Sequence, residues 1–120
     1  MGELYSRIKQ LMADNPELID SDGYPFKGIG TREKLAYAVY LDNQKDFWQH
    51  PQEFAAIDTT SGEYVFGKNF DDARNKYEKK NLPKETNHVL ELDEDGCIKN
   101  MLDGQILEYL EFCSKQLVKE

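Results

Sequence analysis

The stretch EFAAIDTTSGEYVFGKNFDDARNKYEKK (residues 53–80) carries the clearest secondary-structure signal in the chain. Two short apolar runs flank residues 59–62, a polar turn whose glycine can take a positive φ, so a β-hairpin is predicted. Asn69 can cap a following helix, with Asp72 three residues further on as in a capping box. The inner face of this helix is predicted to hold Phe70, Ala73 and Tyr77.

Helices are predicted on both sides of this unit. Residues 3–13 place their apolar side chains on one stripe, and residues 105–119 repeat apolar residues at spacings of four, three and four. Residues 35–48 are ambiguous, since their apolar alternation fits a strand while their alanines fit a helix. Helix is the favoured interpretation, and Pro51 ends it.

Residues 88–99 are predicted to form a second hairpin, with Asp93, Glu94, Asp95 and Gly96 as its turn. The resulting order is α-α-ββ-α-ββ-α. It indicates an α+β fold, in which about four helices cover a small antiparallel sheet made of two hairpins. The absence of repeats and of linker-like composition predicts one domain over residues 1–120.

Residues 53–80 also resemble, as a unit, the hairpin followed by a helix that is found in many small prokaryotic domains. The resemblance covers about a quarter of the chain. It involves no catalytic residue, so it implies no activity.

The formal net charge of −8 disfavours two classes of partner. Nucleic-acid binding by phosphate neutralisation needs basic surface, as does docking on anionic lipid. No apolar run approaches the length of a membrane span, and the N-terminus lacks signal-peptide features. Cys97 and Cys113 form no zinc spacing and are expected to be reduced thiols. A cytoplasmic protein is therefore predicted.

Two loop motifs fail on inspection. Residues 20–31 begin like a calcium loop, but Tyr24, Pro25 and Thr31 stand where that pattern needs an oxygen ligand, a glycine and a glutamate. The Gly-Ile-Gly of residues 28–30 lacks the third glycine of a dinucleotide loop and the Gly-Lys-Ser/Thr ending of a P-loop. Neither segment predicts a ligand, and no cofactor or metal is expected.

The predicted functional surface is acidic. Residues 93–95 form the densest carboxylate group in the chain, on a turn that solvent surrounds. Trp48 is a candidate anchor because tryptophan is enriched in binding hot spots, although a core position is the favoured alternative for it. The full set of predicted partner-binding residues is Asp93, Glu94, Asp95, Asp103, Glu108, Glu111 and Trp48.

These features favour a non-enzymatic interaction protein. Its acidic surface would bind a basic site on a partner protein and occlude that site. Inhibitors, immunity proteins and antirestriction factors work in this way. One alternative is a small enzyme or ligand-binding domain with a pocket made of dispersed residues such as Tyr24, Trp48, His50 and His88. Another is a structural domain that dimerises through apolar surface on the last helix.

Overall fold

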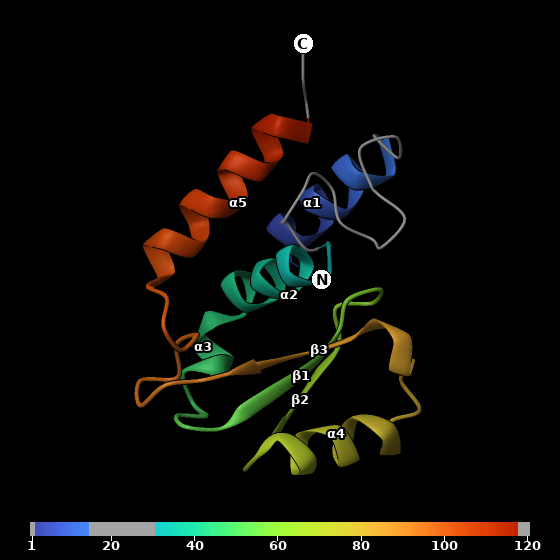
Figure 1. Ribbon diagram of the computed structural model, residues 1–120, viewed down its shortest axis with the longest axis vertical. Helices are drawn as coiled ribbons and strands as arrows, with labels where there is room; N and C mark the ends of the chain where they lie inside the picture. The colour runs from blue at the N-terminus through green and yellow to red at the C-terminus, as the bar shows by residue number, and fades with distance from the viewer. Residues whose placement is uncertain (1, 15–30, 118–120) are drawn as a thin grey trace.

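An antiparallel sheet runs through the middle of the molecule (Figure 1). The computed structural model describes residues 2–14 and 31–117, with Thr31 and residues 113–117 described by their backbone alone. In this part of the chain the strands are β1 (Phe54–Asp58), β2 (Tyr64–Gly67) and β3 (Asn87–Glu91). Their order is β2-β1-β3, so the first hairpin strand lies at the centre of the sheet.

The helices cover both faces of this sheet (Figure 1). One face carries α1 (Glu3–Asp14), α2 (Thr31–Asp42), the short α3 (Gln44–Phe47) and α5 (Asp103–Leu117), and the other face carries α4 (Phe70–Lys79). A 3-10 turn (Lys84–Thr86) leads from α4 into β3. The fold is α+β, as predicted.

The alternation of side chains along β1 gives each face its own core. Ala55 and Ile57 point into the larger core, under α1, α2 and α5, while Ala56 packs with Ala73 and Tyr77 of α4. Because both faces of β1 are covered, this strand is apolar almost throughout. The larger core also contains Tyr5, Ile8, Met12, Leu35, Val39, Tyr40, Phe47, Leu90, Leu92, Ile106 and Leu110.

The hairpin and its following helix form as predicted. Gly62 takes a φ of 82° in the turn between β1 and β2. The Asn69 side chain accepts a hydrogen bond from the Asp72 backbone N–H (2.8 Å), and the Asp72 carboxylate accepts one from the Lys68 N–H (2.9 Å). The helix start is thus capped from both sides.

Three sequence-based expectations need correction or refinement. Residues 35–48 are helical, as favoured, but they divide into α2 and α3 at Asn43. The prediction of a second hairpin is wrong for its last strand. Residues 97–99 form a single bridge, between Leu92 and Ile98, and no fourth strand. Phe70 is 46% exposed and does not belong to the inner face of α4.

The first helix is attached to the body by polar contacts as well as by its apolar face. The Asp42 carboxylate, at the end of α2, accepts hydrogen bonds from the N–H groups of Leu4 (3.1 Å) and Tyr5 (2.8 Å). These are N–H groups of the first turn of α1, which have no partner within the helix. None of the helices in the described residues combines the length and the apolar character that crossing a bilayer requires.

Candidate functional site

The acidic turn of residues 93–96 is rigidly built around Asp93. One oxygen of its carboxylate accepts the backbone N–H groups of Asp95 (2.8 Å) and Cys97 (3.0 Å). Its own backbone pairs with Cys97 and Gly96 across the turn. Asp93 is therefore occupied in holding the turn, whereas Glu94 and Asp95 are exposed to solvent.

Gly96 brings this turn against Trp48. Its φ of 81° favours glycine, and an added Cβ would lie 2.6 Å from the Trp48 Cα and 2.8 Å from the Phe47 carbonyl oxygen. The turn therefore packs directly on the end of α3. Trp48 is 42% exposed and lies beside the acidic turn, so the core position favoured for it is wrong.

Asp103 lies at the start of α5 in a polar network that leads back to Trp48. The Tyr40 hydroxyl donates to Asp103 Oδ1 (2.6 Å) and accepts from Trp48 Nε1 (3.1 Å), while Gln44 Nε2 donates to Asp103 Oδ2 (2.8 Å). Burial of the Tyr40 ring and its bond to Asp103 raise the pKa of this phenol far above its ordinary value. Asp103 thus orders α2, α3 and α5 instead of projecting toward solvent.

Cys97 borders the same network. Its Sγ donates a weak hydrogen bond to Asp103 Oδ2 (3.9 Å). Burial raises the pKa of the thiol, the hydrogen bond with the Tyr40 hydroxyl opposes this in part, and the negative charges of Asp103 and Asp93 add to the rise. A thiol held protonated in this way is a weak nucleophile. The side chain of Cys113 lies outside the described residues.

Glu108 and Glu111 lie on the outer side of α5, opposite the buried Ile106 and Leu110. In the described part of the chain, no ion pair involves Glu108, Glu111, Glu94 or Asp95. These four carboxylates together with Trp48 are named the acidic surface below.

The segment that contains the four carboxylates is strongly acidic. Residues 91–112 contain seven acidic residues and one basic residue, Lys99. The Lys99 ammonium pairs with the Glu91 carboxylate at 2.7 Å and so neutralises a residue outside the acidic surface. The turn and the start of α5 lie at the same end of the sheet (Figure 1). Glu94, Asp95, Glu108 and Glu111 are all exposed, and their gathering on one side of the molecule stays a prediction.

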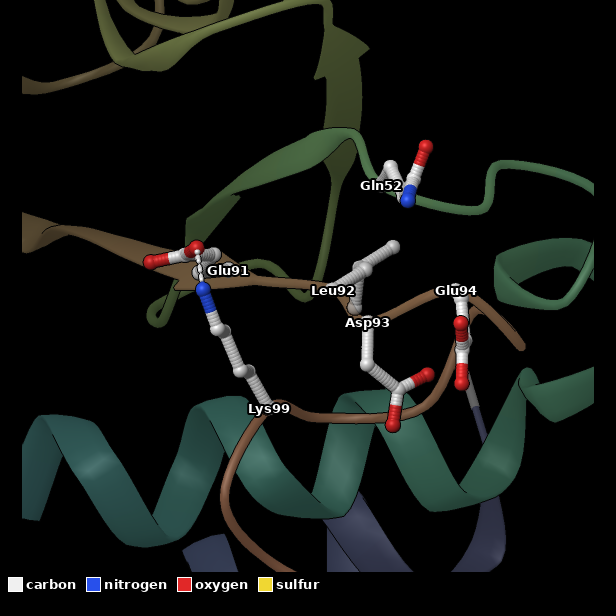
Figure 2. Close-up of a pocket in the computed structure, with 6 residues that line it drawn as sticks. All are labelled: Gln52, Glu91, Leu92, Asp93, Glu94 and Lys99. Atoms are coloured by element: carbon white, nitrogen blue, oxygen red, sulfur yellow. Dashed lines mark hydrogen bonds and ion pairs between the residues drawn. The ribbon is translucent and has the colours of Figure 1, made fainter.

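An open hollow of about 440 Å³ lies beside the turn. Figure 2 shows its lining residues, and the carboxylates of Glu91, Asp93 and Glu94 point in different directions without converging. In the described residues no group of three or more His, Cys, Asp or Glu side chains is placed to hold a metal ion. The residues that line the hollow are Gln52, Glu91, Leu92, Asp93, Glu94 and Lys99.

Gln52 is one of the lining residues that were not predicted from the sequence, together with Glu91, Leu92 and Lys99. It takes a φ of 61°, uncommon for a residue other than glycine, asparagine or aspartate, and its N–H donates to the Asp93 carbonyl (2.8 Å). This bond fixes the loop before β1 to the acidic turn. No sequence signal marks Gln52, because its conformation results from a contact between segments about forty residues apart.

The dispersed residues proposed for an alternative pocket lie apart. His50 stacks on Phe66 of β2, with ring centroids 3.7 Å apart, and its Nδ1 lies 3.2 Å from a Glu53 oxygen. His88 belongs to β3 at the other edge of the sheet, where burial lowers its pKa. The hollow that His88 borders contains neither His50 nor Trp48. Tyr24 lies outside the described residues.

No family model, no curated protein and no solved structure matches the chain.

Proposed function

We propose that this protein is a non-catalytic binding protein that uses the acidic surface to occupy a basic site on a partner protein. The carboxylates of Glu94, Asp95, Glu108 and Glu111 would pair with lysine and arginine side chains of that site. Binding would then block access of the partner's anionic ligand, which is the mode of action of inhibitors, immunity proteins and antirestriction factors. The protein would act in the cytoplasm, without direct contact to nucleic acid or membrane.

One observation carries this proposal: the carboxylates of the acidic surface form no ion pair in the described part of the chain. Like charges on neighbouring positions of a surface repel each other, and in the described residues no ion pair offsets that cost for these carboxylates. A basic partner would offset it. The long-range field of such a surface mainly accelerates association.

Apolar side chains beside the carboxylates supply the contact area that charge alone does not. Trp48 is exposed next to the turn, and Leu102, immediately before α5, is 72% exposed. Large side chains at the centre of an interface, surrounded by charges, are the usual anchors of tight binding. The Trp48 indole is already oriented by its bond to Tyr40, which lowers the entropy lost on binding.

Charge reversal at the turn tests the proposal. In a pull-down from the source cells, wild type is expected to retain a partner that the double variant Glu94→Lys/Asp95→Lys loses. With the purified partner, the association rate should fall on the order of tenfold, and its dependence on salt should flatten. Asp93 is left unchanged because its carboxylate holds the turn.

The matched control is Glu63→Lys/Glu85→Lys. Both glutamates are exposed, and they lie near the end of the sheet opposite to the acidic turn. The two double variants have the same net charge, because each replaces two acids by two lysines. If both double variants lose binding equally, the loss is explained by net charge and not by the position of the acidic turn. An unchanged association rate of Glu94→Lys/Asp95→Lys would contradict a role of the acidic surface in binding.

A second candidate function is dimerisation through α5. Leu107 and Phe112 are 42% and 54% exposed on the outer part of this helix. Apolar side chains of this size on a helix surface are also typical of contacts between copies. The two functions predict opposite effects of salt, because screening weakens pairing with a basic partner and strengthens association between two acidic copies.

A further inference from the structure

The outer edge of β3 offers unused backbone hydrogen-bonding groups. In its antiparallel ladder with β1, the Leu92 N–H donates to Glu53 and the Thr59 N–H donates to Thr86. Since these bonds alternate along an antiparallel pair, His88 and Leu90 also turn their backbone groups toward β1. The groups of Asn87, Val89 and Glu91 therefore point away from the sheet.

The chain itself begins a fourth strand on this edge and then leaves it. Lys99 N–H donates to the Glu91 carbonyl (2.9 Å), next to the bridge between Leu92 and Ile98. Asn100 then takes a φ of 69°, and Met101 N–H turns back to the Ile98 carbonyl. The edge is thus able to pair with an antiparallel strand, but the position beside Val89 is left open.

Three backbone groups remain at this open position. They are the Val89 N–H, the Val89 carbonyl and the Asn87 carbonyl, while the Asn87 N–H already donates to Lys84. In the described residues none of the three has a hydrogen-bond partner. Open strand edges of this kind accept extended peptides as an added strand.

A hollow of about 360 Å³ lies between β3 and α4, directly beside this edge. Its apolar wall consists of the exposed Phe70 ring together with Tyr77 and Val89. The Arg74 guanidinium lies over the Phe70 ring, 5.7 Å from its centroid. A side chain pointing down from an added strand would enter this hollow, because alternate residues of a strand face the same side.

The rim of the hollow is positively charged. Arg74 and Lys84 both lie near Glu78, at 3.8 Å and 4.0 Å, so a single carboxylate is shared between two cations. The wider segment of residues 68–84 contains six basic and three acidic residues. The Asn87 side-chain oxygen borders the hollow and is buried without a hydrogen-bond partner in the described part of the chain. The two cations favour an acidic occupant, while the Asn87 oxygen can only accept and would take a donor such as an N–H of the added strand.

We infer that the edge of β3 and the hollow under it bind an extended segment of a partner protein as a fourth strand. The segment would carry an apolar and an acidic side chain two residues apart. The apolar side chain would contact Phe70 and Val89, and the acidic one would pair with Arg74 or Lys84. This surface does not overlap the acidic surface. Its partner segment is acidic, whereas the partner of the acidic surface is basic.

Two capped octapeptides test the inference: Thr-Val-Thr-Glu-Thr-Val-Thr-Glu and the same peptide with lysine in place of glutamate. Nuclear magnetic resonance titration is expected to show binding of the glutamate peptide, with amide shifts confined to β3 and α4. Hydrogen exchange of the Val89 amide should slow on binding, because its N–H gains a partner. The lysine peptide should bind at least about fivefold more weakly.

Two variants of the full chain separate the strand contact from the charge contact. Val89→Pro removes the outward N–H together with the valine side chain that lines the hollow, but no hydrogen bond of the ladder to β1, and it should abolish binding while circular dichroism remains unchanged. Arg74→Glu should weaken binding of the glutamate peptide by about fivefold or more. It should also reduce the preference of the protein for the glutamate peptide over the lysine peptide. Lys79→Glu, on α4 but outside the hollow, is the matched control and should leave binding unchanged.

Several results would overturn the inference. Equal binding of both peptides would exclude the charge contact, and an unchanged Val89 amide would exclude strand addition. Shifts that cluster in residues 91–112 would assign any binding to the acidic surface. Protection of the Val89 amide that grows with protein concentration, without peptide, would show that a second copy of this chain pairs with the edge.

Discussion

Asp58 is a buried charged residue that connects segments at one end of the sheet. It is 2% exposed at the end of β1, and its carboxylate accepts hydrogen bonds from the Thr60 N–H and hydroxyl, the Ser61 hydroxyl and the Thr86 hydroxyl. These donors come from the turn after β1 and from the segment before β3. One buried carboxylate thus holds three segments together, a role that its position at the end of a hairpin strand does not reveal.

Replacing Asp58 should lower stability in a pH-dependent way. Burial acts to raise the pKa of Asp58, but the bonds from Thr86, Thr60 and Ser61 outweigh it, and the pKa in the folded state is lowered. The charged form therefore contributes stability at pH values above the unfolded pKa of about 3.9, and this contribution disappears as pH falls through the folded pKa. Asp58→Asn should reduce the free energy of unfolding by about 1–3 kcal/mol at neutral pH.

Urea denaturation at several pH values checks this expectation. The difference between wild type and Asp58→Asn should shrink as the pH falls below about 4. Glu63→Gln, in the same turn but exposed, should change stability by less than about 0.5 kcal/mol. A difference that stays constant down to strongly acidic pH would contradict the role assigned to the charge.

Tyr40 joins the candidate site to the core through a single hydroxyl. Tyr40→Phe removes the donor to Asp103 and the acceptor of Trp48 Nε1, so a cost of about 1–2 kcal/mol in unfolding free energy is expected. Trp48 is the one tryptophan of the chain, so its fluorescence reports the change directly. The emission should shift to longer wavelength as the freed indole becomes more mobile in water. Unchanged emission would show that the bond to Tyr40 does not hold the indole in solution.

At the scale of elements, the attachment of α4 to the sheet depends on Gly67. An added Cβ there would lie 2.2 Å from the Ala73 nitrogen and 2.6 Å from its Cα, so the backbone of α4 would have to move. Gly67→Ala should therefore cost at least about 3 kcal/mol in unfolding free energy, as measured by denaturation. Gly104→Ala is the control, since nothing lies within 4 Å of its added Cβ near the start of α5. It should be neutral or stabilising by up to about 1 kcal/mol.

The sequence allowed the prediction of elements where local signals agree. The β1–β2 hairpin and α4 were predictable because the turn glycine, the Asn69 cap and the apolar pattern all lie within residues 53–80. The second hairpin was overpredicted, because the turn of residues 93–96 exists while its second strand stops after one bridge. That stop depends on the turn at Asn100, where the chain leaves toward α5.

The candidate site was predictable in its charge but not in its geometry. Runs of acidic residues are visible in a sequence, and the exposure of Glu94 and Asp95 follows from their place at the tip of a turn. That Asp93 and Asp103 are occupied by internal hydrogen bonds is not visible there. The bonds of Asp103 come from residues about sixty positions away. Side chains that meet only in the folded state leave no local pattern.

At the scale of the whole molecule, two segments of the chain differ strongly in charge. The helix α4 and its flanks, residues 68–84, hold six basic and three acidic residues, while residues 91–112 hold seven acidic residues and one lysine. Figure 1 shows α4 and α5 on opposite sides of the sheet. The net charge of −8 is therefore unevenly distributed, with one basic and one acidic segment. The basic segment can attract an acidic partner and the acidic segment a basic partner. Salt screens the effect of each segment on the other beyond a Debye length of about 8 Å.

Salt dependence distinguishes binding through the acidic surface from dimerisation through α5. Two copies of a chain with a net charge of −8 repel each other, so self-association through Leu107 and Phe112 should strengthen when salt screens that repulsion. Pairing with a basic partner should weaken under the same change. If the acidic surface is the binding site, light scattering should give the monomer mass at about 0.05 M and at about 0.3 M salt. A mass that rises with salt, and that Leu107→Glu returns to the monomer value, would identify α5 as a dimer interface instead, because a buried glutamate pair would repel across the two-fold axis.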